Sequence, residues 1–310
     1  YEDLDPENLG IPDFEIPDFS KPENKMPPEI EEEPIEAPKD PTTKVGDVWI
    51  FGEHMLLCGD ATDPKSYKTL MGDDKADICF TSPPYNAGSL EIEGNESTQK
   101  KYASHDDELT EDDYRKFLVD NMRCVKSKAH EVFYNIGLVE NNKRVIIELM
   151  SRFKDAFKDV IYWNKSTAAP HIEPGIVNNK VEFILCFGDG RRKFRTPQFG
   201  QGKYWNVIEG SNASGNQYAK IHKATFPLYL PDNIVTNFCE PNGKVLDPFA
   251  GTGTTLIACE KSSRIFFGME LDPSYCDLIV KRWEEYTGKK AILGDTGKTF
   301  NEVSSDRGKQ

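Results

Sequence analysis

The sequence lacks paired cysteines and long apolar runs. Its 310 residues contain seven cysteines, an odd number, and no two of them stand in a C-x-x-C arrangement. Such cysteines are typical of small buried side chains in a reducing compartment rather than of disulfides or a zinc site. No apolar stretch approaches the roughly 18 residues of a membrane-spanning helix. We therefore predict a cytoplasmic protein that neither spans a membrane nor holds a metal.

Basic residues are scarce at the start of the chain, and this scarcity is local. Residues 1–46 hold fourteen Asp and Glu against four Lys, a net charge of −10 out of −14 for the whole chain. Residues 1–44 are also rich in Pro, which predicts an acidic tail or linker. The near-repeat IPDFEIPDF at 11–19 offers an alternative, an extended arm that docks through its Phe and Ile side chains. Because the acidity is confined to this tail, it does not exclude a nucleic-acid partner for the rest.

From residue 45 onward, short apolar runs alternate with segments of helical periodicity. ADICF (76–80) is typical of a buried strand, whereas residues 109–129 carry apolar side chains at helical spacing. Thr110 and Asp113 predict a capping box at the start of that helix. Regular alternation of this kind predicts an α/β fold, with a mostly parallel central sheet and helices on both faces. We place one domain at residues 45–302, followed by a short C-terminal tail at 303–310.

Two stretches interrupt the alternation. Residues 87–109 are polar and predict a loop. Residues 188–221 mix basic, aromatic, Gly and Asn residues, which is typical of an insert that contacts nucleic acid. An ordinary surface excursion would have a similar composition, so both interpretations stand at this point.

The segment TSPPYNAG (81–88) follows the ADICF strand directly. Two prolines remove two backbone donors and fix two φ angles, so the chain leaves the strand through a rigid corner that is poor in N–H groups. An aromatic residue, Tyr85, stands beside it.

A second motif, KVLDPFAGTGTTLIACE (244–260), leads from an apolar strand through a glycine-bearing turn into a helix. Gly251 and Gly253 let the backbone approach a ligand closely. A phosphate-binding loop would need Lys after the glycines, and a dinucleotide fingerprint would need a small residue at Leu256. Both are missing. Glu270, at the end of the next strand, is placed to accept hydrogen bonds from ribose hydroxyls. The pattern predicts a nucleoside ligand without phosphates.

Together with HKATFP (222–227), these two motifs resemble those of the DNA amino-methyltransferases. Enzymes of that family methylate N6 of adenine or N4 of cytosine with S-adenosylmethionine. The corner precedes the glycine loop, which is similar to the circularly permuted β class, and the resemblance spans roughly residues 45–295. It implies a Rossmann-like methyltransferase fold with a sheet of the seven-stranded type, and DNA as the partner. It also implies a bacterial or phage source, as in relatives that carry a ParB-like domain, and pairing as a homodimer.

The resemblance gives the corner a chemical role. An exocyclic amino group is a poor nucleophile because its lone pair is delocalised into the base. Acceptors aimed at its N–H bonds favour a more tetrahedral nitrogen, and rigid carbonyls without competing donors suit that task. The target base must first leave the duplex. No Pro-Cys pair is present, in keeping with direct transfer. The implied catalytic residues are Ser82, Pro83, Pro84 and Tyr85, with Tyr85 stacking on the base.

Further roles are carried over residue by residue. The donor would be held by the glycine loop, by three carboxylates and by the HKATFP segment, through Asp60, Asp247, Phe249, Gly251, Gly253, Thr254, Glu270, His222 and Thr225. The nucleic acid would be contacted through Asn86, Trp163, Lys165, Arg191, Arg192, Lys193 and Arg195. Glu182 in VEFIL, like Trp163 and Lys165, matches motifs that line the target pocket in this family. Relatives often show His-Glu where this chain has Val181-Glu182, so Glu182 is left out of the predicted site residues. A solvated basic turn is the alternative for residues 191–195.

The target base is predicted from two residues that point in different directions. In this family Ser at position 82 favours N4 of cytosine, whereas Asn86 is more usual in adenine enzymes, which are also the commoner group. We therefore favour N6 of adenine. Two other function classes stay open: an inactive DNA-binding regulator on the same fold, and a methyltransferase for RNA or for a protein side-chain amide. Relatives of the last kind generally place the glycine loop before the corner.

Overall fold

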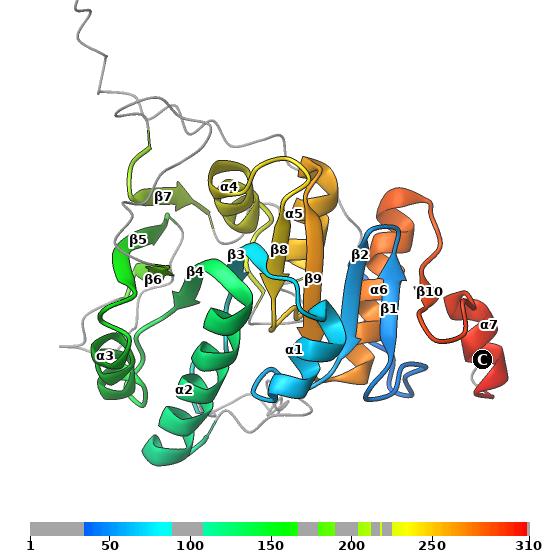
Figure 1. Ribbon diagram of the computed structural model, residues 1–310, viewed down its shortest axis with the longest axis horizontal. Helices are drawn as coiled ribbons and strands as arrows, with labels where there is room; N and C mark the ends of the chain where they lie inside the picture. Colours follow the sequence, from blue (N-terminus) through cyan, green and yellow to red (C-terminus); the bar gives the residue numbers. More distant parts are fainter. Residues whose placement is uncertain are drawn as a thin grey trace, which may run out of the picture.

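The computed structural model describes residues 34–88, 108–166, 179–189, 204–211, 218 and 225–308. Within these segments the chain forms a single large sheet flanked by helices (Figure 1). The strands are β1 (Val48–Phe51), β2 (His54–Cys58), β3 (Ala76–Thr81), β4 (Ala129–Ile136), β5 (Phe157–Lys165), β6 (Val181–Gly188), β7 (Val207–Gly210), β8 (Lys244–Asp247), β9 (Ile265–Glu270) and β10 (Ile292–Leu293). The helices are α1 (Pro64–Met71), α2 (Glu111–Lys128), α3 (Lys143–Arg152), α4 (Tyr229–Phe238), α5 (Thr254–Ser262), α6 (Pro273–Thr287) and α7 (Phe300–Asp306).

The strand order is β10-β1-β2-β9-β8-β3-β4-β6-β5-β7. From β2 to β4 all neighbours are parallel, and antiparallel pairs join β1 to β2 and β6 to β4 and β5. Side chains of α1, α2 and α3 pack on one face of the sheet, while those of α4, α5 and α6 pack on the other (Figure 1). The predicted α/β fold, with a mostly parallel sheet covered on both faces, is confirmed.

The helix boundaries follow from local chemistry. Thr110 caps α2 as predicted, since its hydroxyl accepts a hydrogen bond from the Asp113 N–H and three acidic residues follow in the first turn. Asp272 caps α6 in the same way, accepting from the Ser274 N–H at 2.8 Å. These caps place the start of each helix next to the end of the preceding strand or loop.

The centre of the sheet contains a topological switch point. The chain leaves β3 and returns through α2 to β4 on one side, whereas it leaves β8 and returns through α5 to β9 on the other. Strands β3 and β8 are neighbours, and the connections that follow them lead to opposite sides of the sheet. A crevice therefore forms between these two connections, at the carboxyl ends of β3 and β8. The Pro-Pro corner follows β3 and the glycine loop follows β8, so the fold brings the two motifs together.

The sheet is wider than predicted. The described residues form ten strands rather than seven, because β1 and β10 extend one end and β7 extends the other. Strand β7 lies inside the predicted insert at 188–221 and pairs parallel with β5, with Tyr162 opposite Val207. Part of that insert is therefore the outer strand of the sheet rather than a loop.

The ends of the globular unit also differ from the predicted boundaries at 44 and 302. The backbone N–H groups of Thr42 and Thr43 donate to Asp277 of α6, so the packed part begins before residue 45. At the other end, α7 continues through Asp306, Val303 is buried in the core, and Arg307 forms an ion pair with Asp47.

Two predictions about composition can be compared with the described residues. All seven cysteines are buried and free, as predicted. None of the helices in the described segments combines the length and the apolar character needed to cross a bilayer.

Candidate active site

A cavity of about 250 Å³ lies at the switch point, and residues from both motifs line it. Ser82 and Pro84 contribute one wall, and Glu270 stands at the end of β9 on the opposite side. The remaining lining comes from the loop after β2, from the glycine loop and from three helices or their flanks, through Gly59, Asp60, Ala61, Thr62, Phe117, Thr225, Phe226, Pro248, Phe249, Ala250, Gly251, Thr252, Thr254, Leu271 and Tyr275. Corner and glycine loop thus face each other across one cavity.

The glycine loop depends on left-handed backbone at two positions. Gly251 has φ +55° and Gly253 has φ +80°, a region that side chains with a Cβ rarely adopt. A Cβ on Gly253 would also lie 3.1 Å from a side-chain carbon of Ile279 in α6. Gly253 is the N-cap of α5 and does not line the cavity, so its contribution is to the shape of the loop.

Asp247 stabilises the glycine loop through hydrogen bonds on the side of the loop away from the cavity. Its carboxylate accepts hydrogen bonds from the hydroxyls of Thr81 (2.8 Å) and Thr255 (2.6 Å) and from the N–H of Phe249. The side chain is fully buried, and burial raises the pKa of this carboxyl to about 6. It is not part of the cavity lining. The sequence analysis predicted that Asp247 contacts the donor, whereas the structure places it behind the loop.

The other two predicted carboxylates do line the cavity. Glu270 accepts hydrogen bonds from the backbone N–H groups of Gly251 (2.9 Å) and Asp272 (3.0 Å), one on each oxygen. Burial raises the pKa of the Glu270 carboxyl to about 7. Asp60 is exposed, and one of its oxygens accepts from the N–H and the hydroxyl of Thr62. Each carboxylate keeps acceptor sites for a ligand.

Aromatic side chains form an apolar wall of the cavity. The rings of Phe249 and Phe117 lie 5.7 Å apart, and Phe226 and Tyr275 also line the cavity. Phe117 and Tyr275 were not predicted as site residues, because on their helices they follow the same spacing as core residues. Thr225 lines the cavity as predicted, beside Thr252. His222, predicted with it, lies outside the described residues.

The corner is held rigidly from several sides. The carbonyl of Pro84 accepts a hydrogen bond from the hydroxyl of Tyr114 at 2.8 Å. The carbonyl of Tyr85 accepts from the side-chain amide of Asn142 at 2.9 Å. The Tyr85 ring lies against Gly137, where an added Cβ would stand only 2.9 Å from a ring carbon. Tyr85 is therefore fixed at its backbone and along its ring.

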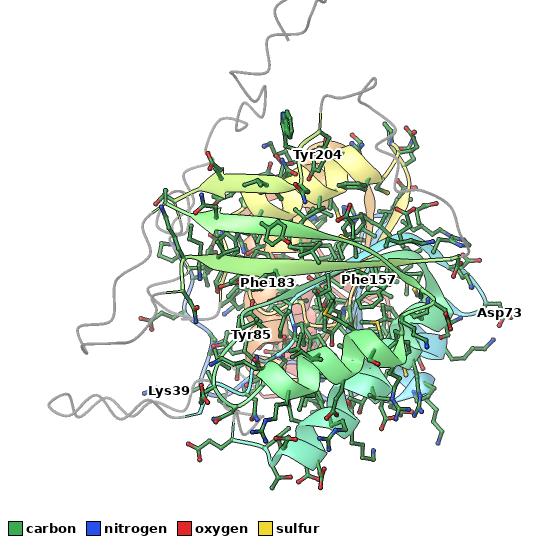
Figure 2. The ribbon with its side chains drawn as sticks, turned by 90° about the vertical axis from the view of Figure 1, so that its left-hand side faces the viewer. Lys39, Asp73, Tyr85, Phe157, Phe183 and Tyr204 are labelled. Atoms are coloured by element: carbon green, nitrogen blue, oxygen red, sulfur yellow. The ribbon has the colours of Figure 1, made fainter. Side chains whose placement is uncertain are left out.

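Five polar side chains meet behind the corner, and we call them the corner network: Ser82, Tyr85, Asn135, Lys165 and Glu182. The Tyr85 hydroxyl donates to Glu182 at 2.8 Å and lies 3.1 Å from the Ser82 hydroxyl. Asn135 donates to the Tyr85 oxygen at 2.8 Å, and Lys165 forms an ion pair with Glu182 at 2.7 Å. In Figure 2 Tyr85 lies below the strand that carries Phe183, the neighbour of Glu182. Asn135 was not predicted from the sequence, whereas Glu182 matches a family motif that lines the target pocket but was not among the predicted site residues.

The residues predicted to contact nucleic acid have other surroundings. Asn86 is buried at φ +59°, and its side chain accepts from the N–H of Leu109 and donates to its carbonyl. Trp163 is only 2% exposed and donates to the Tyr229 hydroxyl. Neither side chain offers an exposed face to a base, so the structure contradicts these two predictions. Arg191, Arg192, Lys193 and Arg195 lie outside the described residues.

The part of the chain that the structure describes holds no group of His, Cys, Asp and Glu side chains that could bind a metal ion.

Known proteins have sequences similar to this one. The family model described as DNA methylase (N6_N4_Mtase) matches residues 76–281. Type II methyltransferase M.BglII of Bacillus subtilis is 26% identical over 240 residues, which cover 66% of this chain and 63% of that protein. M.Cfr9I of Citrobacter freundii is 29% identical over 127 residues, 39% of this chain and 42% of that protein. This chain thus spans less than two thirds of the length of each of these relatives.

Solved structures with a similar fold include a DNA methyltransferase and a protein described as a putative DNA modification methylase. PvuII DNA methyltransferase, which is cytosine-N4-specific, superposes with a TM-score of 0.59 at 17% identity, covering 82% of this chain and 91% of that one. TTHA0409 of Thermus thermophilus, solved with S-adenosylmethionine, superposes with a TM-score of 0.52 at 23% identity, and the match covers 79% of this chain and 96% of that one. At these identities the likeness concerns the fold. Because the family model covers well over half of the sequence, the chain belongs to the N6_N4 DNA methylase family, whose methyl donor is S-adenosylmethionine.

Proposed function

We propose that this chain transfers the methyl group of S-adenosylmethionine to the exocyclic amino nitrogen of a base in DNA. One observation carries the proposal: Ser82 and Pro84 of the corner face the glycine loop and Glu270 across a single cavity at the switch point of the sheet. Ligands of open α/β sheets bind at such a crevice. The family membership supports the same reaction.

The chemistry of the cavity suits an adenosine ligand without phosphates. Its described lining contains two carboxylates, Asp60 and Glu270, and no Lys, Arg or His. Glu270 would accept from the ribose hydroxyls and Asp60 from the adenine amino group. The aromatic wall around Phe249 and Phe117 would cover the apolar faces of the donor. A phosphorylated ligand would find no cation in this lining.

The amine would react directly with the donor. The bound donor supplies an electrophilic methyl carbon next to a positively charged sulfur. The amino nitrogen attacks that carbon, the carbon–sulfur bond breaks with its electron pair going to sulfur, and the nitrogen then loses one proton. Ser82 would accept a hydrogen bond from the amine and hold its lone pair toward the methyl group. Because the cavity lies inside the sheet edge, the target base would have to leave the duplex.

The choice of base rests on Ser82. The preference for adenine rested on the occurrence of Asn86 in adenine enzymes and on the greater number of such enzymes, and neither ground is a contact with the base: in this structure the Asn86 side chain binds the backbone of Leu109. Ser82 then favours N4 of cytosine, the base named for the similar PvuII enzyme. We therefore put cytosine N4 first and adenine N6 second. A cytoplasmic location, in line with seven free cysteines, and pairing as a homodimer belong to the same proposal.

The test is methyl transfer from labelled S-adenosylmethionine, run in parallel on DNA, RNA and protein acceptors. We expect label in DNA alone, and mass spectrometry of the digested nucleosides should find N4-methylcytosine. N6-methyladenine would reverse the choice of base and keep the enzyme class. Label in RNA or protein, or donor binding without any transfer, would refute the proposed function in favour of the two alternatives above.

A further inference from the structure

The donor and the acceptor of each hydrogen bond between Ser82, Tyr85 and Glu182 in the corner network can be assigned by counting protons. Glu182 is paired with Lys165 at 2.7 Å and is therefore a carboxylate, which can only accept hydrogen bonds. The single hydroxyl proton of Tyr85 points to Glu182, at 2.8 Å. In the 3.1 Å contact between Tyr85 and Ser82, the serine must then be the donor.

The same count of protons means that the hydroxyl oxygen of Ser82 can accept a hydrogen bond from a group bound in the cavity. Its one proton points to Tyr85, and one of its lone pairs receives the amide of Asn135 at 3.3 Å. The other lone pair is available on the side where Ser82 lines the cavity. An amino group bound there would donate to Ser82, and each following hydrogen bond would point the same way, to Tyr85 and then to Glu182.

Resting on the proposed function, we infer that Glu182 acts on the methylated amine through Tyr85 and Ser82. It is a positioning residue: its negative charge sets the direction of the chain and so makes Ser82 an acceptor. It is also the place where the proton lost by the amine ends. Glu182 itself lines no part of the cavity.

The proton transfer balances along the three groups. When the nitrogen–carbon bond forms, the nitrogen carries one proton in excess. That proton passes to the Ser82 oxygen, the Ser82 proton passes to the Tyr85 oxygen, and the Tyr85 proton passes to Glu182. Both hydroxyls end as neutral as they began, and Glu182 becomes a neutral carboxyl beside Lys165 until it releases the proton to solvent.

Asn135 supports this arrangement from inside the sheet. Its amide nitrogen lies 2.8 Å from the Tyr85 hydroxyl, 3.0 Å from Glu182 and 3.3 Å from Ser82, so it donates among all three acceptors. Its amide oxygen is buried and has no hydrogen-bond partner among the described residues. An unsatisfied buried acceptor costs stability. That cost indicates that the amide is retained for the donors it gives to the network.

The decisive variant is Glu182→Gln, measured by single-turnover methylation of genomic DNA from a methylation-deficient bacterial strain. The glutamine oxygen can still accept from Tyr85, but the charge and the proton affinity are lost. We expect the transfer rate to fall about 100-fold, the lower range for a lost proton acceptor. The affinity for S-adenosylhomocysteine should stay within about twofold, because Glu182 does not reach the donor side.

Tyr85→Phe provides a second, independent test. The ring against Gly137 is kept, whereas the link between Ser82 and Glu182 is broken. We expect a loss similar to that of Glu182→Gln, and little further loss in the double variant, because residues that act as one unit are not additive. If Glu182 merely anchors the ring, Glu182→Gln should transfer the methyl group at a rate close to wild type. The separate effects of the two substitutions on the rate should then multiply in the double variant.

A matched control comes from an ion-paired carboxylate outside the corner network and the cavity lining. Glu148 of α3 is exposed and forms an ion pair with Arg115 of α2. Glu148→Gln should leave transfer unchanged. If wild type labels DNA while Glu182→Gln and Tyr85→Phe keep its rate, the inference is wrong and the proposed function stands. If wild type labels no DNA, the proposed function fails and the inference fails with it.

Discussion

The backbone N–H of Gly251 donates to the carboxylate of Glu270 across 2.9 Å, although 19 residues separate them. This bond ties the glycine loop after β8 to the end of β9. The second oxygen of Glu270 accepts from Asp272, the N-cap of α6. One side chain therefore fixes the relative positions of three segments, and two of these line the cavity.

Replacing Glu270 should weaken donor binding. Glu270→Gln leaves one acceptor oxygen for two backbone N–H groups, so one buried donor loses its partner, at a cost of about 1–3 kcal/mol. We expect the dissociation constant for S-adenosylmethionine, measured by calorimetry, to rise about 10- to 100-fold. Glu285→Gln on the exposed face of α6 is the matched control and should bind the donor normally. Equal affinities for the two variants would contradict the role of Glu270.

The buried carboxyl of Asp247 predicts a pH dependence of stability. Its pKa is raised from 3.8 to about 6 by burial, so the folded state binds the proton more tightly than the unfolded state. Stability from this group is fully present below about pH 4 and is lost as pH rises through about 6. In Asp247→Asn the titration is absent. The free energy of unfolding, from urea titrations between about pH 4 and 7, should decline less steeply in the variant. Parallel slopes would show that Asp247 has an ordinary pKa.

The central part of the site could be predicted from the sequence because its geometry follows from the strand order. Residues at the carboxyl ends of parallel strands meet at one edge, and Ser82, Gly251 and Glu270 do line one cavity there. Their roles stay predictions, that of Ser82 from the family resemblance. The direction of a side chain is a different matter. Asp247 stands at the end of a strand just as Glu270 does, yet it points under the loop and reaches Thr81 and Thr255. Only packing distinguishes the two.

The contacts of Asn135 and Glu182 with the corner could not be predicted for a related reason. Asn135 and Glu182 come from β4 and β6, which lie 53 and 97 residues away from the corner residues that they contact. Their meeting depends on the antiparallel pairing of β4 with β6, which places Asn135 opposite Ile184. Nothing in the sequence sets that register. Strand β7 was missed because its sequence VIEG has only two apolar residues and lies in a polar segment, and β10 because two residues are too few to show a period.

Gly253 is expected to be intolerant of a side chain for two separable reasons. Gly253→Ala must adopt φ +80°, and its Cβ would press on Ile279 at 3.1 Å. Gly288 has φ +70° and open space around it, so Gly288→Ala measures the cost of the positive φ without any steric contact. We expect Gly288→Ala to lose about 1 kcal/mol of unfolding free energy and Gly253→Ala to lose about 1–3 kcal/mol. In an Ile279→Ala background, which lacks both contacted γ-carbons, the losses at Gly253 and Gly288 should become similar. Urea titrations of the two glycine variants in the wild-type and Ile279→Ala backgrounds measure this, and equal losses at the two glycines in the wild-type background would exclude a clash.

Asn86 should matter for stability rather than for contact with DNA. Its side chain makes two hydrogen bonds to the backbone of Leu109, at 2.7 and 2.9 Å, and so joins the two ends of the 87–109 segment. Asn86→Ala loses both bonds and also places alanine at φ +59°, which should cost about 1–3 kcal/mol. Asn86→Gly also loses both hydrogen bonds but relieves the backbone strain, so its stability should lie between that of wild type and that of Asn86→Ala. The affinity for DNA, measured by fluorescence anisotropy at a temperature where all three proteins are folded, should be unchanged. A selective loss of DNA binding with normal stability would instead restore the contact that the sequence predicted.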